Sequence, residues 1–116
     1  MQSSEIWDQE QLRTSLGVMK QIMPKLVNTF LGQTTSVLET LNNQSDSQLM
    51  LTAHSLKGSA GQLCCKRLAN ISAKIEHELK LQIMENVDAK RAALIDELMA
   101  ARQLMSEYIQ QNEPFA

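Results

Sequence analysis

A histidine, a lysine and a glycine stand close together in the stretch AHSLKGSAGQL, residues 53–63. Side chains three and four positions apart lie on the same side of an α-helix, so Lys57 and Gly58 share the side of His54. A neutral imidazole near pH 7 is a competent nitrogen nucleophile. Phosphorylation would place about two negative charges on the ring, and a mobile lysine within reach can neutralise part of them. The spacing therefore predicts phosphoryl transfer through His54.

The glycines of this stretch support that interpretation. A glycine inside a helix costs about 0.5 to 1 kcal/mol relative to alanine, yet two of the four glycines in the chain, Gly58 and Gly61, lie close after His54. Helical side chains lean toward the helix N-terminus, so a side chain at position 58 would lean over His54. We expect Gly58 to keep the imidazole open to a bulky partner, with close helix packing as the alternative. For Gly61, packing or helix termination is the favoured interpretation.

The chain has no motif for binding ATP. The loop pattern G-x-x-x-x-G-K-[ST] does not occur, and the run GSAG at residues 58–61 does not match a nucleotide-binding fingerprint. We therefore expect a carrier that receives its phosphoryl group from another protein. No autokinase activity and no cofactor are expected in this domain.

Composition argues against several other classes of protein. At 116 residues the chain has the size of one domain, so we treat residues 1–116 as a single domain. The formal net charge of -2 argues against a general nucleic-acid binder. Its four aromatic residues are too few for base-stacking platforms or an aromatic ligand cage. No apolar run approaches the roughly 18 to 20 residues of a spanning helix, and no secretory signal is visible, so no direct membrane contact is expected.

The two cysteines, Cys64 and Cys65, are neighbours and make a poor disulfide framework. This indicates a reducing compartment, hence the cytoplasm. Successive helical side chains diverge by about 100°, and no C-x-x-C or H-x-x-x-H spacing occurs, so no metal site is expected. The two thiols are interpreted as small buried groups, and the second histidine, His77, as an ordinary exposed residue.

Apolar residues recur at helical spacing along almost the whole chain, which predicts an all-α protein. We expect a short helix over Ile6–Leu16, ended by Gly17. A second helix is expected over Pro24–Asn42, beginning with a proline that suits the first helical turn. Four helices of about 18 to 24 residues with short connectors favour an antiparallel up-down four-helix bundle. The short N-terminal helix would cap one end of this bundle.

Local signals mark the later helices. Ser45 and Gln48 form a capping box that starts the third helix. The fourth is expected over residues 68–83, and Asp88 is expected to N-cap the fifth. The polar tail, residues 110–116, is expected to fray.

The predicted face of the third helix decides where His54 lies. Its apolar stripe consists of Leu49, Ala53, Leu56, Ala60 and Leu63. His54 is one residue, or about 100°, away from this stripe, so we expect the ring to be exposed. Most methionines are interpreted as core-filling residues, with Met19, Met23 and Met50 partly exposed.

The stretch HSLKGSA, residues 54–60, resembles the signature of histidine-containing phosphotransfer (HPt) domains. The similarity continues through KRLA at residues 66–69 and IE at residues 75–76, and with the helix pattern it covers almost the whole chain. The resemblance implies a four-helix bundle whose exposed histidine exchanges a phosphoryl group with aspartates of receiver domains. Many such domains are the C-terminal modules of bacterial hybrid sensor kinases, which implies tethering to the inner membrane within a longer chain.

Carried over residue by residue, His54 resembles the phosphorylated histidine, Lys57 the charge-stabilising lysine and Gly58 the glycine that gives access. Glu76 stands where the family often has a glutamine or glutamate near the ring. Such a group accepts a hydrogen bond from Nδ1–H and leaves Nε2 as the nucleophile. The sequence departs from the family at residues 64–65, where Gly-Ala is common, so the shape of that turn stays open.

Charge is unevenly distributed along the chain. Residues 50–82 carry five basic and two acidic side chains, whereas the rest carries six basic and eleven acidic ones. A receiver's aspartate pocket is acidic, so this polarity would steer docking. The receiver is expected to supply Mg²⁺, and the isolated domain is expected to be a monomer. The expected docking residues around the histidine are Met50, Leu51, Gly61, Gln62 and Lys80.

Three alternatives are weighed against this hypothesis. A non-catalytic helical interaction module, with His54 incidental, predicts no acid-labile phosphate. An inhibitory phosphotransfer-like domain would lack a usable histidine, which the presence of His54 and Lys57 disfavours. A DNA-binding helix-turn-helix is disfavoured by the net charge and by the length of the predicted helices.

Overall fold

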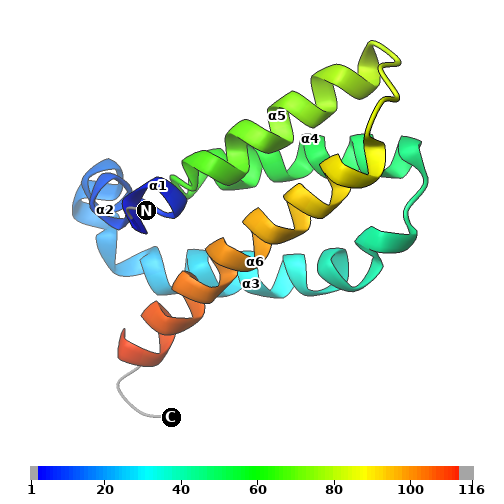
Figure 1. Ribbon diagram of the computed structural model, residues 1–116. Helices are drawn as coiled ribbons and strands as arrows, with labels where there is room; N and C mark the ends of the chain where they lie inside the picture. Colours follow the sequence, from blue (N-terminus) through cyan, green and yellow to red (C-terminus); the bar gives the residue numbers. More distant parts are fainter. Residues whose placement is uncertain (1–2, 113–116) are drawn as a thin grey trace.

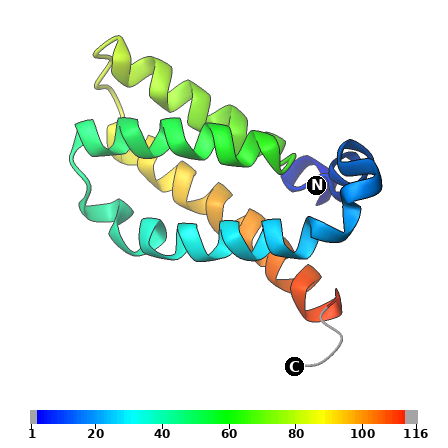
Figure 2. The same cartoon turned by 180° about the vertical axis from the view of Figure 1, so that it is seen from behind.

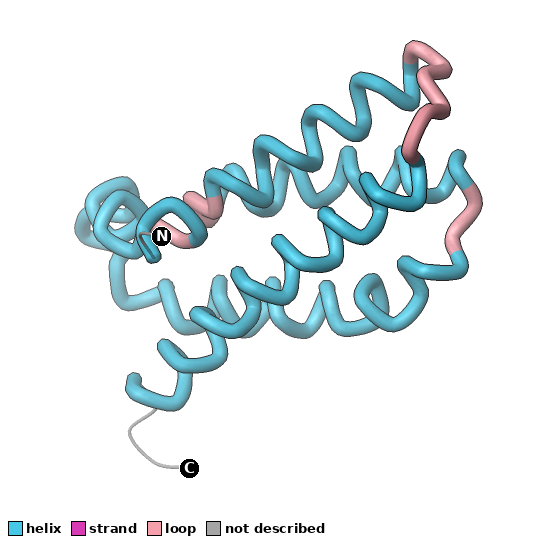
Figure 3. The backbone as a smooth tube through the Cα atoms, in the orientation of Figure 1, coloured by secondary structure: helices cyan, strands magenta, loops and turns pink. Residues whose placement is uncertain are grey.

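The computed structural model describes residues 3–112, and every regular element in that part of the chain is helical. The four long helices are α3 (Met23–Thr40), α4 (Asp46–Gln62), α5 (Lys66–Lys80) and α6 (Val87–Asn112). They run alternately up and down, which confirms the predicted antiparallel four-helix bundle (Figure 1). α4 packs most closely against α5, while α6 crosses α3 and α5 obliquely. The connections lie at the ends of the bundle (Figure 3), so the flanks of the long helices stay uncovered by loops.

Three short elements precede the bundle helices: α1 (Ser3–Ile6), α2 (Gln9–Leu16) and η1, a 3-10 helix over Gly17–Ile22. They gather at one end of the bundle, as predicted (Figure 2). Gly17 ends α2 with a positive φ of 55°, and its N–H donates to the carbonyl oxygen of Arg13. Glycine adopts this left-handed conformation without a steric penalty. The hydrophobic pattern of the sequence did not predict η1, the 3-10 helix that follows.

The prediction of one continuous helix over Ile6–Leu16 is wrong, because the chain breaks at Trp7 and Asp8. Asp8 N-caps α2 by accepting a hydrogen bond from the backbone N–H of Gln11 at 3.0 Å. Trp7 is buried, and its indole N–H donates to the carbonyl oxygen of Leu63 at 2.9 Å. The break therefore depends on a contact with a residue far along the chain.

The second predicted helix is present as α3, with Pro24 in its first turn, followed by the 3-10 turn η2 (Leu41–Asn43). Met23, expected to be partly exposed, is buried. It shares the core-facing side of α3 with Val27 and Phe30, at positions i, i+4 and i+7.

The capping box at the start of α4 is confirmed. Ser45 Oγ accepts from the N–H of Gln48 at 3.2 Å, and Gln48 Oε1 accepts from the N–H of Ser45 at 3.0 Å. The predicted apolar stripe is confirmed as well, because all its members are buried: Leu49, Ala53, Leu56, Ala60 and Leu63. After Gln62 the chain turns through Cys64, which has a positive φ of 63°. Both thiols are free, with Cys65 buried and Cys64 partly exposed.

The fourth helix is shorter than predicted. α5 ends at Lys80 instead of continuing to Ile83, and Ile83 is exposed. The backbone of Gln82 takes a left-handed φ of 61°, which a continuing helix does not allow. With α5 at 15 residues and α6 at 26, the long helices vary more in length than the sequence pattern indicated.

The start of the last helix also differs from its prediction. Asp88 lies inside the first turn of α6 and not at its N-cap. Asn86, with a φ of 58°, instead provides the carbonyl oxygen that accepts from the N–H of Lys90 at 2.9 Å. At the other end α6 continues to Asn112, so the tail predicted from residue 110 is helical for its first residues. The rest of that tail, residues 113–116, lies outside the described part of the chain.

Within residues 3–112, no helix combines the length and the apolar composition that a membrane span requires.

Candidate functional site

His54 lies near the middle of α4, on the flank of the bundle. Its neighbour Ala53 is fully buried, whereas 63% of the His54 side chain is exposed. The apolar stripe of α4 faces the core, and a residue about 100° away from it reaches solvent. The prediction of an exposed imidazole is confirmed.

A single buried carboxylate contacts this histidine and two lysines. Glu76 of α5 is only 4% exposed, and its Oε2 lies 2.5 Å from Nδ1 of His54. Lys57 of α4 donates from Nζ to Oε1 of Glu76 at 2.6 Å. Lys80, one turn further along α5, places its Nζ 3.1 Å from Oε2. We call these four residues, His54, Lys57, Glu76 and Lys80, the Glu76 cluster.

The cluster keeps Glu76 ionised. The hydrogen bond from Lys57 is the largest cause that lowers the pKa of Glu76, to about 2, and Lys80 and His54 lower it further against the opposing effect of burial. An ionised carboxylate can only accept hydrogen bonds, so its contact with His54 requires a proton on Nδ1. In the neutral ring, Nε2 then carries the free lone pair, on the side of the ring that points away from Glu76. The ring is thus held in the tautomer that a nucleophilic Nε2 needs.

The space around the two helical glycines is open. A Cβ added at Gly58 or at Gly61 would have no packed neighbour within 4 Å. Close helix packing therefore does not explain either glycine, and of the two interpretations given for Gly61, packing or helix termination, only termination remains. Gly61 does lie in the last turn of α4, where its carbonyl oxygen accepts from the N–H of Cys64 at 3.2 Å.

The residues predicted to contact a partner occupy the same helix or its neighbour. Leu51 is 65% exposed, whereas Met50 is half-buried and packs against the core. Gly61 and Gln62 are exposed at the C-terminal end of α4. The exposed members of this set, above all Leu51, are available to a partner, whereas Met50 exposes only part of its side chain.

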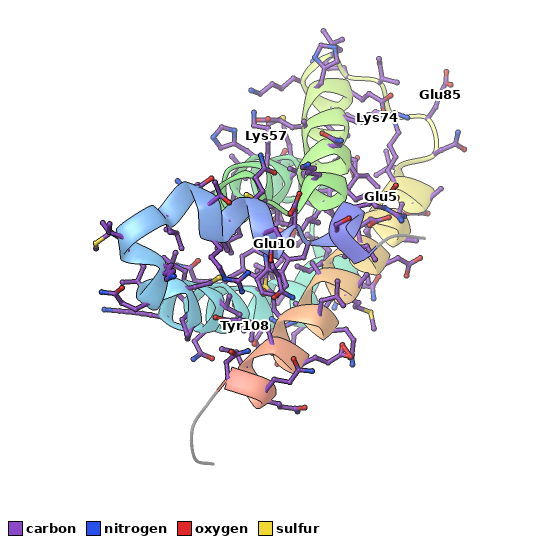
Figure 4. The ribbon with its side chains drawn as sticks, turned by 90° about the vertical axis from the view of Figure 1, so that its left-hand side faces the viewer. Glu5, Glu10, Lys57, Lys74, Glu85 and Tyr108 are labelled. Carbon is purple, nitrogen blue, oxygen red and sulfur yellow. The ribbon has the colours of Figure 1, made fainter. Side chains whose placement is uncertain are left out.

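Lys80 was predicted from the sequence as a docking residue, and its ion pair with Glu76 was missed. The signal was present, since an acid and a lysine four positions apart on one helix face each other. The contact of Lys57 with the same carboxylate had no local signal, because it joins two helices. In Figure 4, Lys57 rises from α4 beside α5, where this contact is made.

The surface over the cluster is positive. Lys57 and Lys80 are both exposed in part, whereas their anionic partner Glu76 is buried beneath them. A visiting group therefore meets two cations beside the exposed imidazole, in agreement with the uneven charge of the sequence. Such a surface favours an anionic ligand or an acidic partner.

Fold and site together define a class of protein: an antiparallel helical bundle that presents one exposed histidine, held by a buried carboxylate and flanked by lysines. The family model described as the Hpt domain matches residues 25–111, and the chain belongs to this family. Proteins of the family are histidine carriers of two-component phosphorelays and interact with receiver domains. Comparison with curated proteins and with solved structures finds no match.

Proposed function

We propose that His54 is the residue that carries the phosphoryl group, accepting it from a phospho-aspartate of one receiver domain and donating it to another. The observation that supports this most is the contact between the exposed imidazole and the buried carboxylate of Glu76. It holds the proton on Nδ1 and leaves Nε2 free on the solvent side. The reaction requires this nitrogen and no other nucleophile.

The step balances without a cofactor in this domain. The lone pair of Nε2 forms the N–P bond while the O–P bond of the acyl phosphate breaks, and the electron pair returns to the receiver's carboxylate. The proton on Nδ1 stays with the ring, hydrogen-bonded to Glu76. The receiver would supply Mg²⁺, since phosphoryl transfer needs positioning and charge neutralisation more than covalent help.

Two neighbours of the histidine take the roles that the family resemblance implies. Lys57 would neutralise part of the charge of the phosphoryl group, because its flexible side chain on α4 is one turn from His54. Gly58 would leave room for the receiver's active site, because nothing projects from this position over the ring. Glu76 would act as the positioning residue that fixes the tautomer.

The receiver would dock on the exposed side of α4 around His54. Leu51 and the exposed part of Met50 would give it apolar contacts on the N-terminal side of His54. Gly61 with Gln62 would leave an exposed polar surface on the C-terminal side. We place the domain in the cytoplasm, as a monomer when isolated, and within a sensor kinase where it is part of a longer chain. Its free thiols suit a reducing compartment.

The test follows a radiolabelled phosphoryl group from a phosphorylated receiver to the domain. His54→Gln is expected to abolish labelling, and Lys57→Ala is expected to slow it. His77→Gln, at an exposed position of α5, is the matched control and should label as the unchanged protein does. Equal labelling of His54→Gln would remove the proposed site. Absence of acid-labile phosphate from the unchanged protein would favour a non-catalytic interaction module instead.

A further inference from the structure

The Glu76 cluster holds two cations for one carboxylate. Lys57 contacts Oε1 from α4, whereas Lys80 contacts Oε2 from the same helix as Glu76. Neutralising one carboxylate requires only one of them. The remaining basic side chains near the α4–α5 turn pair elsewhere, Lys66 with Asp8 and Arg67 with Glu97.

The proposed function gives Lys57 a second partner besides Glu76. In the unphosphorylated domain its Nζ is bound to Glu76, yet phosphoryl transfer requires it at the phosphoryl oxygens on Nε2. Turning away would leave a buried carboxylate without its hydrogen bond from Lys57, beside a newly introduced double negative charge. A buried charge that loses its partner is costly, and repulsion from the phosphoryl group would add to that cost.

We propose that Lys80 is a positioning residue that keeps Glu76 ionised and in place while Lys57 moves from Glu76 to the phosphoryl group. This inference rests on the proposed function. Lys80 can hold this role because it contacts Oε2, the same oxygen that accepts from His54, and leaves Oε1 to Lys57. Lys57 then exchanges one oxygen for another as the N–P bond forms, and returns when the bond breaks. No further ion or reactant is needed.

The proposal predicts that Lys80 matters most in the phosphorylated state. In a domain that lacks Lys80 and carries no phosphoryl group, Lys57 alone would hold Glu76, and the Nδ1 proton of His54 would keep its acceptor. When the phosphoryl group is bound, Lys80 is the only lysine that remains on the carboxylate, beside the Nδ1–H of His54. Loss of Lys80 should therefore release Glu76 from the ring after phosphorylation and not before it.

The experiment uses the ¹⁵N-labelled domain with potassium phosphoramidate as the phosphoryl donor, so that no particular receiver is needed. Lys80→Gln is compared with Lys74→Gln, the same change at an exposed position of α5, and with Lys80→Arg, which retains the cation. Circular dichroism checks that each variant is folded. The readouts are the Nδ1–H signal of His54 at neutral pH, before and after phosphorylation, and the rate of phosphohistidine formation.

Lys80→Gln is expected to keep the Nδ1–H signal before phosphorylation, to lose it afterwards and to form phosphohistidine about three- to tenfold more slowly. Lys74→Gln and Lys80→Arg should match the unchanged protein. The proposal is overturned if Lys80→Gln behaves as Lys74→Gln in both states, or if it loses the signal already before phosphorylation. If the unchanged protein forms no phosphohistidine with either phosphoramidate or a phosphorylated receiver, the proposed function fails instead.

Discussion

At the scale of single residues, Glu76 and Gly58 serve His54 in different ways. Glu76 holds the ring from the buried side, and its charge fixes which nitrogen carries the proton. Gly58 leaves the exposed side of the ring uncovered, because no side chain projects from its position toward the ring. The two residues therefore respond differently to substitution.

Gly58 can be tested for stability and access separately. Gly58→Ala is expected to raise the free energy of unfolding by about 0.5 to 1 kcal/mol, because a Cβ meets no neighbour and alanine is the better helix former. Gly58→Leu should slow phosphoryl transfer strongly, because its side chain leans toward His54. Denaturant unfolding and transfer rates measure the two effects.

Gly32 provides the matched control, because it is an exposed glycine within α3 with equally open space around it. Gly32→Leu should stabilise the fold without slowing transfer. Equal transfer rates for the leucine variants at positions 58 and 32 would show that the space beside His54 has no role in access.

Glu76 gives the stability of the domain a specific dependence on pH. Its pKa in the folded protein is about 2, below the ordinary value of 4.5, so its ionised form stabilises the fold. That contribution is fully present above about pH 4.5 and is lost as the pH falls through about 2. The difference in unfolding free energy between the unchanged protein and Glu76→Gln should therefore shrink over this range.

Chemical denaturation at a series of pH values measures this difference. Glu107→Gln, at an exposed position of α6, is the control and should show no such trend. A difference for Glu76→Gln that stays constant from pH 6 to pH 2 would contradict the role of the Glu76 charge in the folded state.

At the scale of the helices, two serines should respond differently to the same substitution. Ser45→Ala removes the N-cap of α4 and should cost about 1 kcal/mol. Ser72 is buried in α5, and its hydroxyl has no hydrogen-bond partner within the described residues. Ser72→Ala should therefore leave the free energy of unfolding unchanged or raise it by about 1 kcal/mol. Thermal or denaturant unfolding of the pair tests both signs, and a loss of stability in Ser72→Ala would reveal a partner for its hydroxyl.

The helices that carry complete local signals were predictable from the sequence. The capping box at Ser45, the proline at the start of α3 and the glycine after α2 all act within one turn of the chain. The exposure of His54 followed from its place beside the apolar stripe. These features depend on near neighbours, which the sequence displays directly.

Several of the features that were missed depend on contacts between distant segments. The break at Trp7 is fixed by a hydrogen bond to the turn after α4. The start of α6 is a local exception, because it follows the left-handed backbone of Asn86, which the hydrophobic pattern does not display. The pairing of Lys57 with Glu76 requires the register of α4 against α5, which periodicity alone does not define. The position of Glu76 near the ring came from the family resemblance, whereas its bonds to both lysines came from the structure.

At the scale of the whole molecule, the bundle is a rod whose principal extents are 45 × 26 × 25 Å. The short N-terminal elements cover one end, and the connection between α5 and α6 lies at the other. His54 falls between these ends, on a flank that no loop covers. This arrangement lets a second globular domain approach the histidine from the side.

The charge of the whole molecule predicts how transfer responds to salt. The flank at His54 is positive, because Lys57 and Lys80 are exposed and Glu76 is buried beneath them, while most acidic residues lie outside residues 50–82. Raising the ionic strength from about 0.01 M to 0.3 M shortens the screening length from about 30 Å to below 10 Å. Steering of an acidic receiver should weaken, so kcat/KM for transfer from a phospho-receiver should fall severalfold while kcat stays nearly constant. Rapid-quench kinetics at a series of salt concentrations measure both constants. Equal values of kcat/KM across the series would show that the basic flank does not guide the partner, and a parallel fall in kcat would place the effect in the chemical step instead.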